Sequence, residues 1–227
     1  MSNGIEVSTK DCTALTDAEL AEMADLSTAS RAAAFSVGFL SKQREEWVLV
    51  THAREEGKLR GYALSTLERI GGTPSLLIGL ASFTRTRCAP QCVDAVMHDL
   101  YRRAVLAFPD EDVLVGTRLA HPSGYRAFVG LEEIVPRPEH RATGEERAWG
   151  RRLAKRFGAD GRLDDRTFVI SGDEEMAGMF DFEPTKEPKE ASVFGAAFAE
   201  LEVSRYDTQV AFGWAMAEAL AEGALPK

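Results

Sequence analysis

Two cysteines, Cys88 and Cys92, lie four positions apart at the start of an expected helix. A helix N-terminus carries unpaired N–H groups and a partial positive charge, which together can depress the pKa of a thiol. Packing of both side chains in the interior is the simpler interpretation. No histidine or further cysteine stands nearby at the spacing of metal ligands, so we expect no metal site and no catalytic thiol.

Two arginines, Arg85 and Arg87, stand in the polar segment that precedes the same helix. Arginine binds phosphate oxygens through charge-assisted hydrogen bonds, and a loop over a helix N-terminus can bind a pyrophosphate. A pair of solvated loop arginines is the competing interpretation. The segment is therefore a candidate anion site.

A third candidate is His121, which follows the apolar run Val113–Thr117. Open α/β sheets bind ligands at the carboxyl ends of such strands, and the pKa of an imidazole suits proton transfer. A turn residue before Pro122 is the alternative. One expected helix also carries a basic face, which suits either an acidic partner or solvent; its residues are Arg147, Arg151, Arg152, Lys155 and Arg156.

The elements that would position these residues follow from hydrophobic periodicity and turn signals. Thr16 with Glu19, and Thr143 with Glu146, have the spacing of helix capping boxes. Three strands joined by short turns predict an antiparallel meander over Trp47–Thr51, Leu59–Arg69 and Leu76–Phe83. The clearest helix runs from Pro90 to Phe108 and leads to the strand Val113–Thr117. A strand, a long crossover helix and a strand predict a parallel pair.

Later segments give weaker signals. The expected elements are helices at 16–24 and 27–42, a short helix at 122–129, a strand at 131–135, a helix at 143–157 and an edge strand at 166–171. Residues 172–189 are acidic and interrupted by proline, which predicts a loop. The rest of the chain is expected to be mostly helical, with a strand over Val210–Trp214 as the alternative.

Composition limits the class of protein. The chain has 227 residues, 44% of them hydrophobic, and a net charge of −9, which suits a soluble globular protein and disfavours nucleic acid as a partner. No signal peptide and no membrane-spanning run are expected. With three cysteines, a cytoplasmic location with reduced thiols is the simple interpretation.

The order helix, helix, antiparallel meander, crossover helix, parallel strand, short helix and strand resembles the GNAT family of acyltransferases. The resemblance covers about 90 residues between Trp47 and Pro138. It implies a mixed α/β sheet, with an acyl-CoA segment formed by Leu76–Phe83, the following loop and the helix from Pro90. The family's later block, a tyrosine followed by Gly-Phe, is matched by Tyr125 and by the Gly-Leu pair at 130–131.

The resemblance implies acetyl-CoA or another acyl-CoA as the cofactor substrate. Its pantetheine arm would lie between two splayed strands and pair with them like an extra strand. The residues expected to bind the cofactor are Thr84, Arg85, Thr86, Arg87, Cys88, Ala89 and Gln91. The family's loop carries small residues where this chain has Cys88 and Pro90. Cysteine adds a side chain and proline removes an N–H donor, so the arginines would have to replace backbone contacts.

In many family members the tyrosine protonates the leaving thiolate, which implies that role for Tyr125. Packing of Tyr125 in its short helix is the alternative. His121 is a further acid or base candidate, and Glu68 is a candidate base acting through water. The acceptor would be a small-molecule amine or a protein amine. A catalytically inactive binding or structural protein with the same fold is the second hypothesis.

The expected domain organisation is a GNAT-like domain over 1–172 and a mostly helical extension over 173–227. The extension carries large apolar residues, among them Phe194, Phe198, Phe212 and Trp214. Such residues either pack on the core or form a homodimer interface.

Overall fold

The computed structural model describes residues 4–27, 34–173, 177–186, 189–199 and 201–225. Its centre is one mixed sheet in the order β1-β2-β3-β4-β9-β5-β10-β8-β7, with β6 paired to β10. The strands are β1 (Glu6–Asp11), β2 (Leu49–Glu55), β3 (Lys58–Ile70), β4 (Thr73–Phe83), β5 (Val113–Leu119), β6 (Glu132–Val135), β7 (Leu163–Asp164), β8 (Val169–Ile170), β9 (Phe180–Asp181) and β10 (Thr208–Ala215).

The predicted fold class is confirmed by the pairing of these strands. β2, β3 and β4 form the antiparallel meander. β4 and β5 are parallel and are connected through the long helix α3. The helices are α1 (Asp17–Ser27), α2 (Val37–Glu46), α3 (Ala89–Ala107), α4 (Gly144–Arg156), α5 (Lys189–Phe194) and α6 (Ala217–Ala221), with 3₁₀ turns η1 (Cys12–Ala14), η2 (Pro122–Phe128), η3 (Gly195–Phe198) and η4 (Val203–Arg205).

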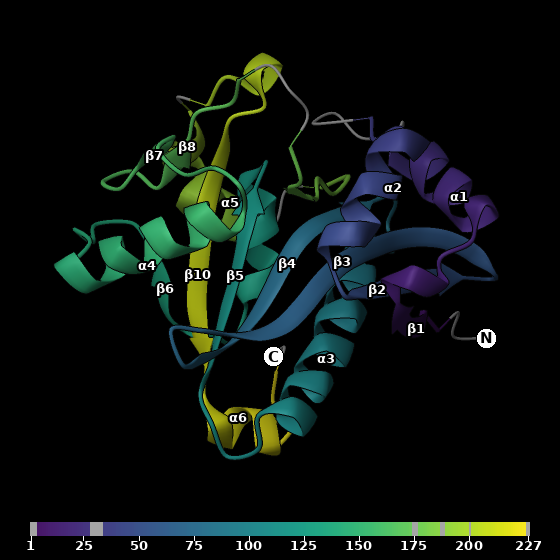
Figure 1. The fold of residues 1–227 in the computed structure, drawn as a ribbon, viewed down its shortest axis with the longest axis horizontal. Helices are drawn as coiled ribbons and strands as arrows, with labels where there is room; N and C mark the ends of the chain where they lie inside the picture. The colour runs from purple at the N-terminus through teal and green to yellow at the C-terminus, as the bar shows by residue number, and fades with distance from the viewer. Residues whose placement is uncertain (1–3, 28–33, 174–176, 187–188, 200, 226–227) are drawn as a thin grey trace.

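The sheet separates two hydrophobic clusters, because successive side chains of a strand point to opposite faces. On β4, Leu77 belongs to the cluster beneath α1, α2 and α4, whereas Leu76 and Ile78 belong to the cluster beneath α3. Figure 1 shows α1 and α2 packed together over one end of the sheet, with α3 running along the strands of the meander. The molecule thus has three layers with the sheet in the middle.

The C-terminal part of the chain differs from the expected helical extension. β10 spans Thr208–Ala215 and pairs antiparallel with β5 from Gln209 to Ala215, and β9 also lies within the sheet. The run of buried residues in β10 suits either a helix or a buried strand by periodicity alone. Pairing with β5 decides for the strand, so β9 and β10 of the expected extension belong to the main sheet.

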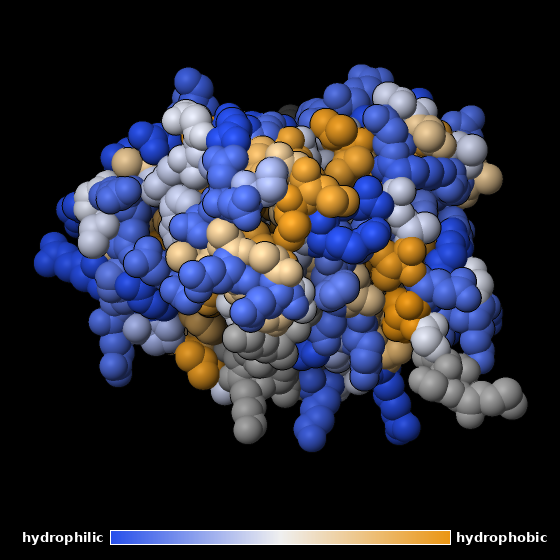
Figure 2. Space-filling model, turned by 90° about the horizontal axis from the view of Figure 1, so that it is seen from below, coloured by the Kyte–Doolittle hydropathy of each residue, from blue (hydrophilic) through white to orange (hydrophobic). Residues whose placement is uncertain are grey.

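The face seen from below in Figure 2 carries exposed hydrophobic surface. Leu106 near the end of α3 is 77% exposed, and a cavity of about 280 Å³ lies between α3 and α6. A homodimer stays a prediction for this chain.

No helix among the described residues is both long and apolar enough to cross a membrane.

Glu19 joins the first strand to the first helix. Its carboxylate accepts hydrogen bonds from Lys10 Nζ at 2.6 Å and from the Thr16 backbone N–H at 2.9 Å, and Thr16 completes the predicted capping box. The hydrogen bond from Lys10 and that from the Thr16 backbone lower the pKa of Glu19 from 4.5 to about 2. A depressed carboxyl pKa stabilises the folded protein above pH 4.5, and the stabilisation is lost as the pH falls toward the folded-state value.

We therefore expect Glu19→Gln to lower the free energy of unfolding by about 1 kcal/mol at neutral pH, since the ion pair with Lys10 lies at the surface and is screened by solvent. The difference from wild type should disappear between pH 4.5 and pH 2, as measured by urea denaturation. Asp17→Asn in the same helical turn is the matched control, because Asp17 makes no hydrogen bond or ion pair with the described residues. A deficit of Glu19→Gln that persists at pH 2 would contradict the argument.

Candidate cofactor groove and neighbouring cavity

The two central strands β4 and β5 pair over only part of their length. Pairing runs from Ser75 opposite Leu114 to Ile78 opposite Thr117, where Thr117 Oγ1 also donates to the Ile78 carbonyl at 2.6 Å. The next residue of β4, Gly79, lies at a register shift against β3. A bulge bends its strand and increases the local twist, so the bulge at Gly79 marks the point where β4 turns away from β5.

Gly79 is covered by the indole of Trp47. A Cβ atom on Gly79 would stand 1.8 Å from two ring carbons of Trp47. The indole is fixed in turn by a hydrogen bond from its Nε1 to Gln43 Oε1 at 3.2 Å and by the guanidinium of Arg156 over the ring at 4.6 Å. Only glycine fits at the bulge while Trp47 keeps this position.

The space beyond the bulge is filled by β9, a segment of the same chain. The Ala81 N–H of β4 donates to the Met179 carbonyl at 2.9 Å, and the Ala120 N–H after β5 donates to the Phe180 carbonyl at 3.2 Å. β9 is parallel to both neighbours. Two backbone donors at the diverging strands are therefore satisfied by Met179 and Phe180 of the chain itself.

The side chains of this segment are buried on both faces of the sheet. Met179 packs in the cluster beneath α1, α2 and α4, and Phe180 and Phe182 pack in the cluster beneath α3. Both phenyl rings contact Phe83 of β4, with centroids 5.6 and 5.9 Å apart. Each fully buried side chain of this size stabilises the docked segment by about 1.5–3 kcal/mol.

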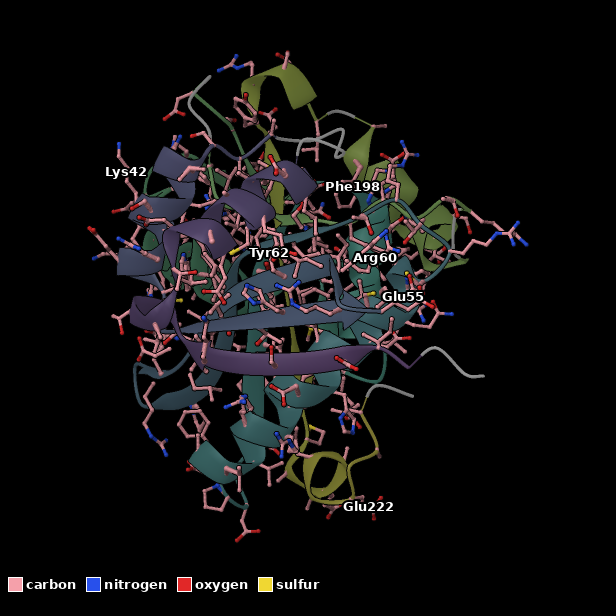
Figure 3. All side chains as sticks on the ribbon, turned by 90° about the vertical axis from the view of Figure 1, so that its right-hand side faces the viewer. Lys42, Glu55, Arg60, Tyr62, Phe198 and Glu222 are labelled. Carbon is pink, nitrogen blue, oxygen red and sulfur yellow. The ribbon has the colours of Figure 1, made fainter. Side chains whose placement is uncertain are left out.

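The loop between β4 and α3 is held from both sides. The Arg60 carbonyl of β3 accepts from the Thr84 N–H at 2.9 Å and from Thr84 Oγ1 at 3.1 Å. Arg60 itself pairs with Glu55 at 3.0 Å, and Figure 3 shows these two side chains close together at one end of the sheet. Arg85 forms an ion pair of 2.7 Å with Glu183, two residues after β9. The segment that carries β9 therefore also forms an ion pair with Arg85, the first arginine of the predicted cofactor loop.

The other predicted cofactor residues surround the start of α3. Arg87 and Gln91 are exposed, whereas Cys88 is half-buried and Ala89 is buried. Thr86 Oγ1 lies 3.1 Å from Cys88 Sγ. Burial raises the pKa of the neighbouring Cys92 to about 12, which fits the interpretation of Cys92 as a packing residue. No cluster of three potential metal ligands is found among the described residues.

Tyr125 lies in η2, which runs beside the groove. The preceding residue, Gly124, packs so closely that a Cβ atom would stand 2.8 Å from Leu119 and 3.5 Å from Phe180. The Tyr125 hydroxyl faces two acceptors, the Pro136 carbonyl at 3.1 Å and Gln209 Oε1 at 3.0 Å. Its ring is stacked on Phe194 at a centroid distance of 3.7 Å. Burial raises the pKa of Tyr125, so its hydroxyl is protonated at neutral pH.

The two other candidate catalytic residues are placed apart from Tyr125. His121 caps η2, with its Nδ1 accepting from the Ser123 N–H at 3.1 Å. Glu68 on β3 accepts from Arg156 Nε at 2.7 Å, and Arg156 belongs to α4 on the other face of the sheet. The structure thus brings His121 and Tyr125 to the same short turn and leaves Glu68 in an ion pair elsewhere.

Two features of the site were not predicted from the sequence. One is β9, which lies inside the segment expected to be a loop. The other is Arg118 of β5, which is 5% exposed and borders a cavity of about 660 Å³ on the face covered by α2 and α4. A short apolar run, with Met179, Phe180 and Phe182, was the sequence signal for β9. For Arg118 the signal was a single charged residue within a largely apolar strand.

Comparisons with known proteins gave matches only among solved structures. No family model matches the chain, and no curated protein matches its sequence. The crystal structure of an aminoglycoside 6′-N-acetyltransferase from Enterococcus faecium is 15% identical, with 52% of this chain and 64% of that chain covered at a TM-score of 0.39. The chain thus spans less than two thirds of that acetyltransferase.

Two further structures are similar to the chain at the same level. An aminoglycoside 6′-acetyltransferase type Ii is 12% identical over 59% of this chain and 88% of that one, at a TM-score of 0.42. A GNAT family acetyltransferase from Brucella melitensis in complex with acetyl-CoA is 18% identical over 56% and 83%, at a TM-score of 0.39. All three proteins are acetyltransferases, and the last is a GNAT family member. The GNAT-like fold of this chain is assigned from its own meander, crossover helix and diverging parallel strands.

Proposed function

We propose that the protein is a GNAT-type acyltransferase that moves an acetyl or other acyl group from CoA to an amine, and that β9 closes its cofactor groove in the conformation described here. The observation that carries the proposal is the divergence of β4 and β5 beyond the Gly79 bulge, directly beside the loop that leads into α3. Two diverging strands with unpaired backbone groups can bind an extended ligand arm as an added strand.

The phosphate end of the cofactor would lie at the start of α3. That helix has 19 residues and begins beside the loop with Arg85 and Arg87, so its positive N-terminal end favours an anion. Arg85 would exchange the Glu183 carboxylate for a phosphate, and Arg87 is exposed and has no described partner. The remaining predicted loop residues, Thr84, Thr86, Cys88, Ala89 and Gln91, would border the same ligand.

The chemistry would take place beside η2. Tyr125 is the proposed proton donor to the leaving thiolate, since η2 borders the groove at Gly124. His121, at the start of the same turn, is the proposed second acid or base. Glu68 as a base would require release of its ion pair with Arg156. The acceptor would be a small-molecule amine or a protein amine.

Binding of acyl-CoA requires β9 to leave the groove. The affinity of a ligand is reduced by the fraction of molecules in the competent state. Because β9 buries Met179, Phe180 and Phe182, that fraction is small, and binding to the wild-type chain is expected to be weak. When β9 leaves, the cofactor phosphates would replace Glu183 at Arg85, and this contact would offset part of the free energy needed to undock β9.

The test is a thermal melt with millimolar acetyl-CoA, in wild type and in the double variant Arg85→Glu with Arg87→Glu. A ligand at 100 times its Kd adds about 2.7 kcal/mol to the stability of the folded state. We expect a rise in Tm for wild type that is abolished by the double charge reversal. Arg102→Glu, an exposed arginine near the other end of α3, is the matched control and should keep the response. A response that survives the double reversal would contradict the proposed role of the loop.

A second candidate function is favoured by one observation, the completeness with which the chain fills its own groove. β9 accepts a backbone hydrogen bond from each side of the groove and Glu183 forms an ion pair with Arg85, so a protein that never binds CoA would need no further change. Such a protein would be a non-catalytic binding or structural member of the fold. It predicts no response to acetyl-CoA, CoA or longer acyl-CoAs, even in variants that loosen β9.

A further inference from the structure

A cavity of about 660 Å³ lies on the face of the sheet opposite α3, apart from the loop at the start of that helix. Its walls are formed by α2, Trp47, β5 and the end of α4, and residues 177–178 close one side. The aromatic side chains of Phe39, Trp47 and Phe157 line it together with several charged groups. A space of this size suits a small organic molecule.

Arg118 is the unusual member of this lining. It projects from the central strand β5, its residue is 5% exposed, and its Nε atom is buried without a hydrogen-bond partner among the described residues. Its guanidinium lies over the ring of Phe157 at 5.3 Å. Burial lowers the pKa of Arg118 to about 10, Arg162 lowers it further and Glu46 raises it in part, so the group remains charged at neutral pH. Among the described residues no carboxylate forms an ion pair with Arg118, and Glu46 at the rim offsets only part of its charge. A buried charge that is only partly compensated is costly, so binding of an anion beside it would be favourable.

Most of the charged side chains that line the cavity with Arg118 are also positive. Lys155 is exposed at the end of α4 and has no ion pair with the described residues. Arg156 and Arg162 also line the cavity, but they are paired with Glu68 and Asp173 respectively. The carboxylate that lines the cavity among the described residues is that of Glu46, which is exposed and accepts from Gln43 at 3.2 Å. After these pairs are counted, the positive charges of Arg118 and Lys155 exceed the negative charge of Glu46.

We propose that this cavity is a binding site for a small organic oxyanion, a carboxylate or a phosphate ester, with the Arg118 guanidinium as its main ligand. The planar fork of arginine matches two oxygens of such a group. Lys155 adds a second positive charge at the rim, and the aromatic side chains contact the apolar body of the ligand. The site does not require CoA or acyl transfer, so it stands whether or not the proposed function is correct.

The experiment compares a charged probe with its neutral analogue. Benzoate and phenyl phosphate carry the two oxyanions on one aromatic body, and benzamide has the same body as benzoate without the charge. We expect a concentration-dependent rise in Tm with benzoate or phenyl phosphate at up to about 10 mM, and none with benzamide. The stronger of the two oxyanion probes identifies whether a carboxylate or a phosphate is preferred.

Arg118→Met removes the charge and keeps most of the side-chain volume. Without ligand this variant should melt at or above the Tm of wild type, because a buried charge that is only partly compensated has been removed. Its affinity for the oxyanion probe should fall at least tenfold. Lys155→Met, at an exposed position, should lower the affinity for the oxyanion probe several-fold without affecting folding. This variant tests the proposal even if Arg118→Met does not fold.

Arg102→Met on α3 is the control for a general loss of positive charge, and it should bind the probe like wild type. The proposal is overturned by an equal response of wild type, Arg118→Met and Lys155→Met, or by the absence of any response to both oxyanions in wild type. Equal stabilisation by benzamide would also overturn it, because the charge would then play no part in binding.

Discussion

Phe180→Ala is expected to increase the affinity for acetyl-CoA by about 100-fold if the groove binds the cofactor. Phe180 is fully buried in the docked segment and contacts Phe83. Loss of a buried phenyl ring destabilises the docked state by about 3 kcal/mol or more, whereas the state in which β9 has left the groove is little affected. Each 1.4 kcal/mol changes the apparent affinity about tenfold.

Titration calorimetry with acetyl-CoA would measure this gain directly. Phe168→Ala is the matched control, because Phe168 is also fully buried but packs against Phe212, away from the groove. Phe168→Ala should lower the free energy of unfolding about as much as Phe180→Ala does, without changing the affinity for acetyl-CoA. If Phe180→Ala and wild type both fail to bind acetyl-CoA and CoA, the acyltransferase proposal fails and the non-catalytic alternative is favoured.

Gly79→Ala is expected to lower the free energy of unfolding by about 3 kcal/mol. The added methyl group would overlap the Trp47 indole, which is held by Gln43 and Arg156. Overpacking of this kind forces a side chain or the backbone out of place and typically costs about 1–3 kcal/mol. The value should lie at the upper end here, because the ring cannot rotate away without breaking its hydrogen bond.

A double-mutant cycle tests the cause of this loss. Trp47→Leu shortens the side chain above Gly79, so Gly79→Ala should cost much less in that background, as measured by urea denaturation followed by circular dichroism. Gly144→Ala at the start of α4 is the control, because its Cβ would meet no atom within 4 Å, and it should be neutral or slightly stabilising. Additive effects of the first two substitutions would show that the bulge is not constrained by Trp47.

The central part of the fold was predictable because its signals are local. The meander, the long amphipathic helix α3 and the strand after it follow from periodicity, and the Thr143–Glu146 capping box marks the start of α4 as expected. Gly57 adopts a φ of 77° in the β2–β3 turn and Gly158 a φ of 70° after α4, a conformation that glycine adopts without strain. Residues 28–33, within the expected helix at 27–42, lie outside the described part of the chain.

The elements that sequence reasoning missed are those fixed by distant partners. β1 has a polar sequence, EVSTKD, and is a strand because β2 offers an edge to pair with. β9 is two residues long by its pairing and exists because β4 and β5 leave a gap. No local pattern reports such a gap, since it arises from the bulge at Gly79 and the end of pairing at Thr117.

The same limit applies to the candidate site. The loop arginines were recognised by type and position, but the partner of Arg85, Glu183, is 98 residues away in sequence. Tyr125 was recognised from the family block, whereas its neighbours Gln209 and Phe194 come from the part of the chain expected to be an extension. Residue types indicated chemistry, and the fold decided which residues could meet.

The chain order of the groove has a consequence for how the protein folds during synthesis. β4, α3 and β5 leave the ribosome before β9, so the two diverging strands are complete while residues 179–182 are still to be added. Contacts between segments that are distant in sequence form late, because closing the intervening loop is costly in entropy. The nascent chain therefore passes through a stage with an open slot in its sheet. A ligand or chaperone present at that stage would compete with the chain's own strand for Ala81 and Ala120, and would determine when folding is completed.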